Sequence, residues 1–169
     1  MTVAEHFFTR QVGEYMRDRF KSALESSLSL KTCHYGDLDP FPTDEELISN
    51  IVPAIFIQPQ RVPSDFATLN QRYRHTYFYR VILVDRLPEG ITQEHVRRKI
   101  ELVADVVVED ISLNAATSPN YGSPAKAQTV WSIVRSLDYR PPEDSFLVSV
   151  NAMLFASAFD WEVKLLMFK

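Results

Sequence analysis

Residues 74–85 read RHTYFYRVILVD, and this stretch decides the fold class. It is rich in aromatic and β-branched residues, which favour a strand. Because side chains alternate along a strand, one face carries Tyr77, Tyr79, Val81 and Leu83, and the other carries Thr76, Phe78, Arg80, Ile82 and Val84. Both faces are largely apolar. We therefore expect a central strand with helices against one face and a neighbouring element or subunit against part of the other.

Two amphipathic helices are predicted, one before and one after this strand. Apolar residues recur at three- and four-residue steps in residues 3–28 and again in residues 92–113. Thr92 is the expected N-cap of the second helix. The buried stripe of the second helix comprises Val96, Ile100, Val103, Val107 and Ile111, widened by Leu102 and Val106.

Gly13 interrupts the apolar pattern of the first helix. A glycine in a helix costs about 1 kcal/mol relative to alanine. It either allows close packing or a bend at this point, or it is a tolerated weak position. The second interpretation is favoured by the sequence.

Shorter elements complete a single α+β domain over residues 1–169. Strands are predicted at residues 29–35, 54–58 and 128–138, the last with Trp131, Ile133 and Leu137 on one face. Residues 43–50 form a short helix with Thr43 as N-cap and Glu46 completing a capping box. Two strands close the chain at residues 146–155 and 160–168, or one strand bent near residues 156–158. The result is a mixed sheet flanked by two long helices.

The helical and strand periods together predict a core. Its expected members are Phe8, Val12, Phe20, Ile55, Ile57, Val81, Leu83, Ile100, Val103, Val107, Ile133 and Val150. Two polar segments, residues 59–73 and 114–127, are expected as loops, and loops of this length inside a domain are usually functional or mobile.

The composition excludes several classes of protein. The chain has 169 residues, 46% of them apolar, and a net charge of -4, which argues against a dedicated nucleic-acid binder. Cys33 is the only cysteine, so no internal disulfide and no cysteine cluster can form. No apolar run reaches the length of about 18 residues that a transmembrane helix needs. The four glycines are too widely spaced for a phosphate-binding loop.

No catalytic, metal-binding or cofactor-binding signature is found, and we expect no enzymatic activity and no cofactor. The histidines His6, His34, His75 and His95 are scattered without metal-ligand spacing. Cys33 and His34 are adjacent, so a strand would direct them to opposite faces, which is poor geometry for a nucleophile and its base. The acidic residues Asp37, Asp39, Asp44, Glu45 and Glu46 lack the register of a calcium loop and suit a helix start.

Arginines and aromatic residues alternate around the central strand. Arg61, Arg72, Arg74 and Arg80 interleave with Tyr73, Tyr77, Phe78 and Tyr79. Such a set could stack on single-stranded bases. The favoured interpretation is a strand edge that meets another subunit, because tyrosine and arginine are enriched at interface cores. The candidate subunit interface comprises Arg61, Arg72, Tyr73, Arg74, Tyr77, Tyr79 and Tyr121.

The order of these elements resembles the tail terminator or tail completion proteins of tailed bacteriophages. The resemblance is carried by the N-terminal helix, the strand PAIFIQ at residues 53–58, the strand HTYFYRVILV at residues 75–84, the helix at residues 92–113, and the strands at residues 128–138 and 146–168. It covers most of the chain and is one of pattern and order, without a diagnostic motif.

The resemblance implies a structural virion protein at the head–tail junction. Six subunits would form a ring that caps the tail tube, stops its polymerisation and docks to the head connector. The implied partners are further copies of the chain, the tail tube protein and the head-connector or neck protein, with no membrane. Genomic DNA would pass through the channel without specific binding, which suits a neutral or acidic wall. The alternatives are another neck, connector or baseplate ring component, and a small α+β nucleic-acid-binding module.

Overall fold

The chain contains three helices and six strands within its described residues, in an order typical of the α+β class. The computed structural model describes residues 3–36, 44–60, 74–86, 93–109, 120–121, 127–138 and 154–167. The elements are α1 (Val3–Leu24), β1 (Thr32–Tyr35), α2 (Glu45–Ile51), β2 (Ala54–Pro59), β3 (Arg74–Arg86), α3 (Gln93–Val107), β4 (Asn120–Tyr121), β5 (Ala127–Asp138) and β6 (Leu154–Met167).

The strands form one mixed sheet in the order β1-β2-β3-β6-β5-β4. β1 pairs parallel with β2, and the other neighbouring pairs are antiparallel. All 13 residues of β3 pair with β6, from Arg74 opposite Leu166 to Arg86 opposite Leu154. The predicted α+β class with a mixed sheet is therefore confirmed. Residues 154–167 form one continuous strand, whereas residues 146–153 lie outside the described part of the chain.

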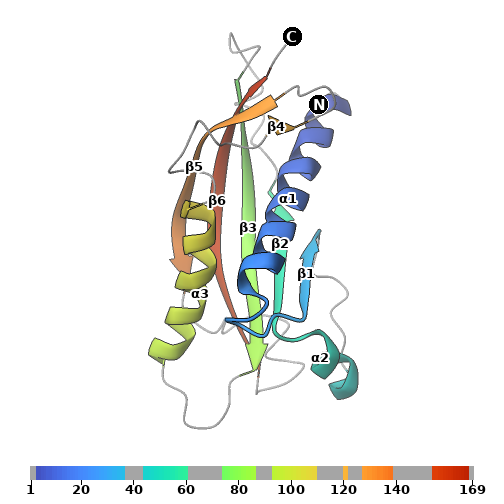
Figure 1. Cartoon of the computed structure of the whole chain (residues 1–169), viewed down its shortest axis with the longest axis vertical. Helices are drawn as coiled ribbons and strands as arrows, with labels where there is room; N and C mark the ends of the chain where they lie inside the picture. Colours follow the sequence, from blue (N-terminus) through green and yellow to red (C-terminus); the bar gives the residue numbers. More distant parts are fainter. Residues whose placement is uncertain are drawn as a thin grey trace.

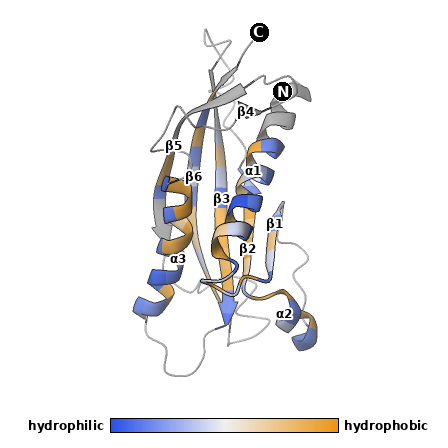
Figure 2. Ribbon diagram, viewed as in Figure 1, coloured by the Kyte–Doolittle hydropathy of each residue, from blue (hydrophilic) through white to orange (hydrophobic). Residues whose placement is uncertain are grey.

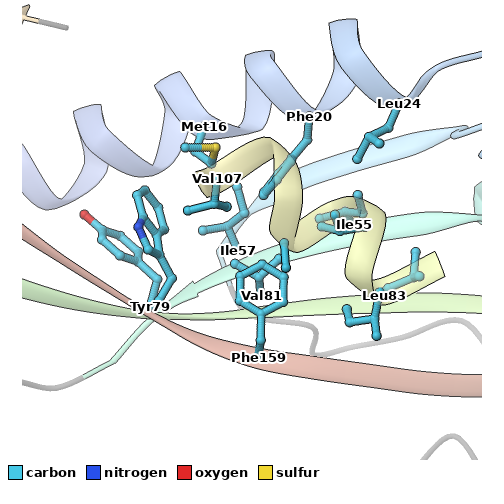
Figure 3. Packing of buried hydrophobic residues seen from close by; sticks show 14 of the residues in the cluster. Met16, Phe20, Leu24, Ile55, Ile57, Tyr79, Val81, Leu83, Val107 and Phe159 are labelled. Atoms are coloured by element: carbon cyan, nitrogen blue, oxygen red, sulfur yellow. The ribbon is translucent and has the colours of Figure 1, made fainter. Parts of the chain in front are cut away.

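α1 and α3 lie on the same face of the sheet (Figure 1), where α1 contacts β1 and β2 and α3 contacts β5 and β6. The alternation predicted for β3 is confirmed, because Tyr77, Tyr79, Val81 and Leu83 all point into this layer. Figure 2 shows hydrophobic and hydrophilic residues interspersed along α3. Its hydrophobic residues Ile100, Val103 and Val107 are buried in the main core. Met16, Phe20 and Leu24 from α1 meet Ile57 and Phe159 from the strands (Figure 3). The main core therefore lies between the two helices and the sheet.

The opposite face of the sheet is covered at one end by α2. A second apolar cluster joins Ile48, Val52, Ala54, Phe56, Val84, Leu154 and Ala156. The N-cap of α2 is Asp44, whose Oδ1 accepts hydrogen bonds from the N–H groups of Glu46 at 2.9 Å and Leu47 at 3.2 Å. The prediction placed the cap at Thr43, which lies outside the described residues. A carboxylate suits this position because it also faces the positive end of the helix dipole.

Arg86 attaches α2 to the end of β3. Its Nη2 donates to Glu45 Oε1 at 2.7 Å and to Ser49 Oγ at 2.6 Å. Lys31 Nζ donates to the backbone oxygen of Ser49 at 2.6 Å. Two basic side chains from separate segments thus hold this seven-residue helix in place, at its first residue and at Ser49.

Ile133 is the one predicted core residue, among those whose side chains the structure describes, that lies at the surface. Its side chain is 45% exposed, whereas its neighbours Ser132 and Val134 point to the core. The sequence pattern did not indicate that Ser132 and Val134 point inward, because Ser132 is polar. Its hydroxyl accepts a hydrogen bond from Trp161 Nε1 at 2.6 Å, which satisfies both groups in the core. The side chain of Phe8 and the whole of Val150 lie outside the described residues.

Leu102 also departs from its prediction. It was expected to widen the buried stripe of α3, but it is 43% exposed, and the small Ala104 is buried instead. The core contact of α3 is therefore narrower than the apolar residues of its sequence indicate. Ile111 and the predicted cap Thr92 lie outside the described residues.

Gly13 has a packing role that the sequence analysis did not favour. A Cβ atom at this position would lie 2.2 Å from two ring atoms of Tyr35. The aromatic ring of β1 therefore rests directly against the backbone of α1. The glycine allows the helix and the edge strand to approach this closely.

Candidate subunit interface

Two residues of the predicted interface are buried inside the chain. Tyr77 is 5% exposed and Tyr79 is fully buried, and Tyr79 stacks on Trp161 with ring centroids 4.7 Å apart. Both rings point toward α1 and α3. This corrects the expectation for these two tyrosines, because a side chain in the core offers nothing to a neighbouring subunit. Aromatic rings on both faces of β3 had left the inward set ambiguous.

The other predicted interface residues are placed only in part. Arg74 is the first residue of β3 and pairs with Leu166, and Tyr121 lies in β4 opposite Ala127. Their side chains are not among those that the structure describes, and neither are Arg61, Arg72 and Tyr73.

The second face of the sheet carries charged residues beyond the end that α2 covers. We call Arg80, Ile133, Arg135, Asp160, Glu162 and Lys164 the polar face. Arg80 Nε donates to Asp160 Oδ1 at 2.9 Å across β3 and β6. Arg135 forms an ion pair with Glu162 across β5 and β6. Two of the three basic residues of this face are thus paired with carboxylates, whereas Lys164 forms no ion pair with a described residue. Ile133, opposite Glu162 in the ladder, is exposed on the same surface.

Strand alternation separates Arg80 from the tyrosines that precede it. Arg80 lies on the polar face, and Tyr77 and Tyr79 lie in the core on the opposite face. A base-stacking surface would need arginine and aromatic side chains on one face. Among the described aromatic residues of this set, Phe78 alone shares the face of Arg80, and it is half-buried. One partly covered ring beside one arginine is a small stacking surface, and this weakens the nucleic-acid alternative.

Both sides of the sheet present strand without a partner. Within the described residues, β1 pairs only with β2, and β4 covers β5 only at Ala127 and Gln128. The sequence predicted a strand edge as an interface without showing which strands lie at the edges. That arrangement depends on pairing between distant segments, so no local pattern could have revealed it.

Cys33 and His34 lie on opposite faces of β1, as predicted. Cys33 packs against the main core, and burial raises the pKa of its thiol to about 12. His34 is exposed and lies edge-on to Phe56, with ring centroids 6.3 Å apart. Burial also raises the pKa of the neighbouring Tyr35 hydroxyl to about 12. A thiol that stays protonated at neutral pH and points away from the histidine is a poor nucleophile.

The buried carboxylate of Asp85 has a structural role. Asp85 is buried at the end of β3 and forms an ion pair with Lys99 of α3, and it also accepts a hydrogen bond from the N–H of Arg86 at 2.7 Å.

In the part of the chain that the structure describes, no group of three or more His, Cys, Asp or Glu residues could hold a metal ion. No described helix has the length and apolar character needed to cross a membrane.

Comparison of the sequence with protein-family models gave no match, and comparison with curated proteins gave no similar sequence.

Proposed function

We propose that the protein is a structural component of the phage head–tail junction, with a tail-terminator-like fold. Copies of the chain form a ring that ends the tail tube and joins it to the head connector. The proposal starts from the order of elements in the sequence, which resembles the tail terminator family. It is supported by a mixed sheet with α1 and α3 together on one face.

One observation carries the proposal furthest, and it is the charge pattern of the polar face. Arg80 pairs with Asp160 and Arg135 pairs with Glu162, so two of the three basic side chains of this face are engaged by carboxylates, and Lys164 is the third. A channel that DNA must traverse needs such a wall, because free lysines and arginines bind the backbone through counterion release. In the proposed ring, α1 and α3 lie outside and the polar face lines the channel.

Ring formation also needs two different contact surfaces on each copy, since a ring is built from heterologous contacts. Within the described part of the chain, the open outer edges of β1 and β5 supply two such surfaces. Contacts of this kind bury roughly 800 Å² or more per partner in stable assemblies.

The proposal is tested by imaging the protein with polymerising tail tubes. A ring of six copies is expected at one end of each tube, and tubes grown with the protein should be shorter than tubes grown alone. Imaging of the complete particle then locates the ring. A position at the head-proximal end supports a terminator, whereas a ring at the baseplate end would favour the alternative virion component. A single copy, or a location away from the tail axis, would contradict the proposal.

A further inference from the structure

Among the described residues, the outer edge of β1 and the outer edge of β5 beyond β4 have no strand partner, and these two strands run in opposite directions. β1 is parallel to β2, and the strands from β2 through β3 and β6 to β5 are antiparallel in turn. β5 therefore runs opposite to β1. If copies are related by rotation about an axis along the strands, β1 of one copy faces β5 of the next with antiparallel polarity. This is the slightly more stable of the two pairings.

The regular part of β5 matches β1 in length. The register of β5 with β6 shifts between Thr129 and Trp131 and again between Val134 and Leu137. Bulges of this kind bend a strand and end regular pairing. Between the shifts, residues 131–134 pair continuously with β6, and β1 also has four residues. The bulges thus leave one regular segment of β5, residues 131–134, that is as long as β1 at the opposite edge of the sheet.

The backbone groups of both edges are directed outward at defined residues. The N–H of Thr32 donates to the carbonyl of Pro53, just before β2, and the N–H of Gly36 donates to the carbonyl of Ile57 in β2. Because alternate residues of a strand bond to the same neighbour, the N–H and C=O groups of Cys33 and Tyr35 point away from the sheet.

The same alternation, followed through the registers of β2, β3 and β6, directs Ser132 and Val134 to the outer edge of β5. The edge residues Cys33 and Tyr35 of β1 and Val134 of β5 all direct their side chains into the main core. Outward backbone groups and inward side chains therefore coincide on both edges.

We propose that β1 of one copy pairs antiparallel with residues 131–134 of the next copy, with His34 opposite Ile133. This register keeps the core-facing residues Cys33 and Val134 on one side of the joined sheet. The exposed side chains of His34 and Ile133 lie on the other side. A slip by one residue would set the core-facing Cys33 opposite the outward-facing Ile133 and would mismatch the outward backbone groups of the two edges, so such a slip is disfavoured. The inference rests on the ring proposed above and names its interface.

The occupant of each edge is a second copy of this chain, because only that choice satisfies both edges at once. A symmetric dimer through β1 would leave β5 unpaired, and a dimer through β5 would leave β1 unpaired. Unpaired edges are a liability that folded proteins cover. Head-to-tail pairing covers both edges of every copy when the ring closes. It also places His34 of one copy beside Ile133 of the next, which covers part of an exposed aliphatic side chain.

The register is tested with a cysteine pair, His34→Cys and Ile133→Cys, in a Cys33→Ala background. Both positions are exposed, so the substitutions leave the core intact. In the proposed register they form a pair without mutual backbone hydrogen bonds, whose Cα atoms lie about 4.5 Å apart, within disulfide range. Mild oxidation should give a ladder of linked copies on a non-reducing gel. Each single-cysteine variant should stay unlinked.

A second pair, His34→Cys with Leu102→Cys, is the matched control, because Leu102 is exposed on α3 at the other face of the sheet. It should give no ladder. Linkage of His34→Cys alone would indicate a symmetric β1 dimer, and linkage of Ile133→Cys alone a symmetric β5 dimer. Either result overturns the proposed pairing.

Mass measurement of the same samples separates this inference from the proposed function. A closed ring without the His34–Ile133 link overturns the edge pairing and leaves the proposed function standing. Linked open chains that never close support the edge pairing and count against the ring. Monomers alone, with tail tubes present as well as absent, overturn both.

Discussion

Gly13 illustrates how a single residue can reverse an ordinary helix preference. Replacement of a helical glycine by alanine usually stabilises a protein by about 1 kcal/mol. Here the new methyl group would meet the ring of Tyr35, and overpacking of this kind costs about 1–3 kcal/mol. Gly13→Ala is therefore expected to lower the free energy of unfolding, measured in urea. In a Tyr35→Ala background the same change should be neutral or stabilising. Equal effects in both backgrounds would contradict the contact.

Cys33 gives the chain a specific sensitivity to alkaline pH. Burial raises the pKa of its thiol from 9.0 to about 12, so the unfolded chain loses this proton first as the pH rises. The free energy of unfolding is therefore expected to fall between about pH 9 and about pH 12. Urea unfolding of Cys33→Ala should show a shallower fall across this range, with the remaining slope partly due to Tyr35. Parallel profiles for the two proteins would show that the thiol does not contribute.

Among the elements, α3 provides the sharpest test of packing, because an exposed and a buried residue are adjacent. Val103 is fully buried and Leu102 is exposed. Val103→Asp places an unpaired charge in the core and is expected to cost about 4 kcal/mol or more, enough to unfold a marginal domain. Leu102→Asp should change stability by about 0.5 kcal/mol or less. Thermal melting followed by circular dichroism measures both, and similar melting temperatures would contradict this orientation of α3.

The strands also show which elements a sequence can predict. The predicted span of β3 ends one residue before the observed end, because a long alternating run of aromatic and β-branched residues is unambiguous. The alternation of its side chains was also predicted correctly. Which of the two faces points inward was left open, and the interface role given to Tyr77 and Tyr79 was wrong. Both faces of the strand are apolar, and only the tertiary position of α1 and α3 decides which one is closed to a partner. Ile133 shows the same limit, since a polar serine beside it occupies the core.

At the scale of the whole molecule, local stability against opening is expected to be highest in the middle of the sheet and lowest at its two edges. β3 and β6 lie in the interior of the sheet and share an uninterrupted ladder, so their amides should exchange most slowly with deuterium. In the monomer, the outward amides of Cys33 and Tyr35 should exchange fast. Assembly should slow them together with those of Ser132 and Val134. Protection that appears instead on α1 or α3 would place the subunit contact on the helices.

The uninterrupted pairing of β3 with β6 has a mechanical consequence. When two long antiparallel strands are pulled lengthwise, every backbone hydrogen bond between them is strained at once, and none breaks before the others. β1, held to the sheet by four residue pairs, would peel away at far lower force. In the proposed ring, each copy would thus have a stiff central pair of strands, and most of its deformation under load would occur at the edges where neighbours meet.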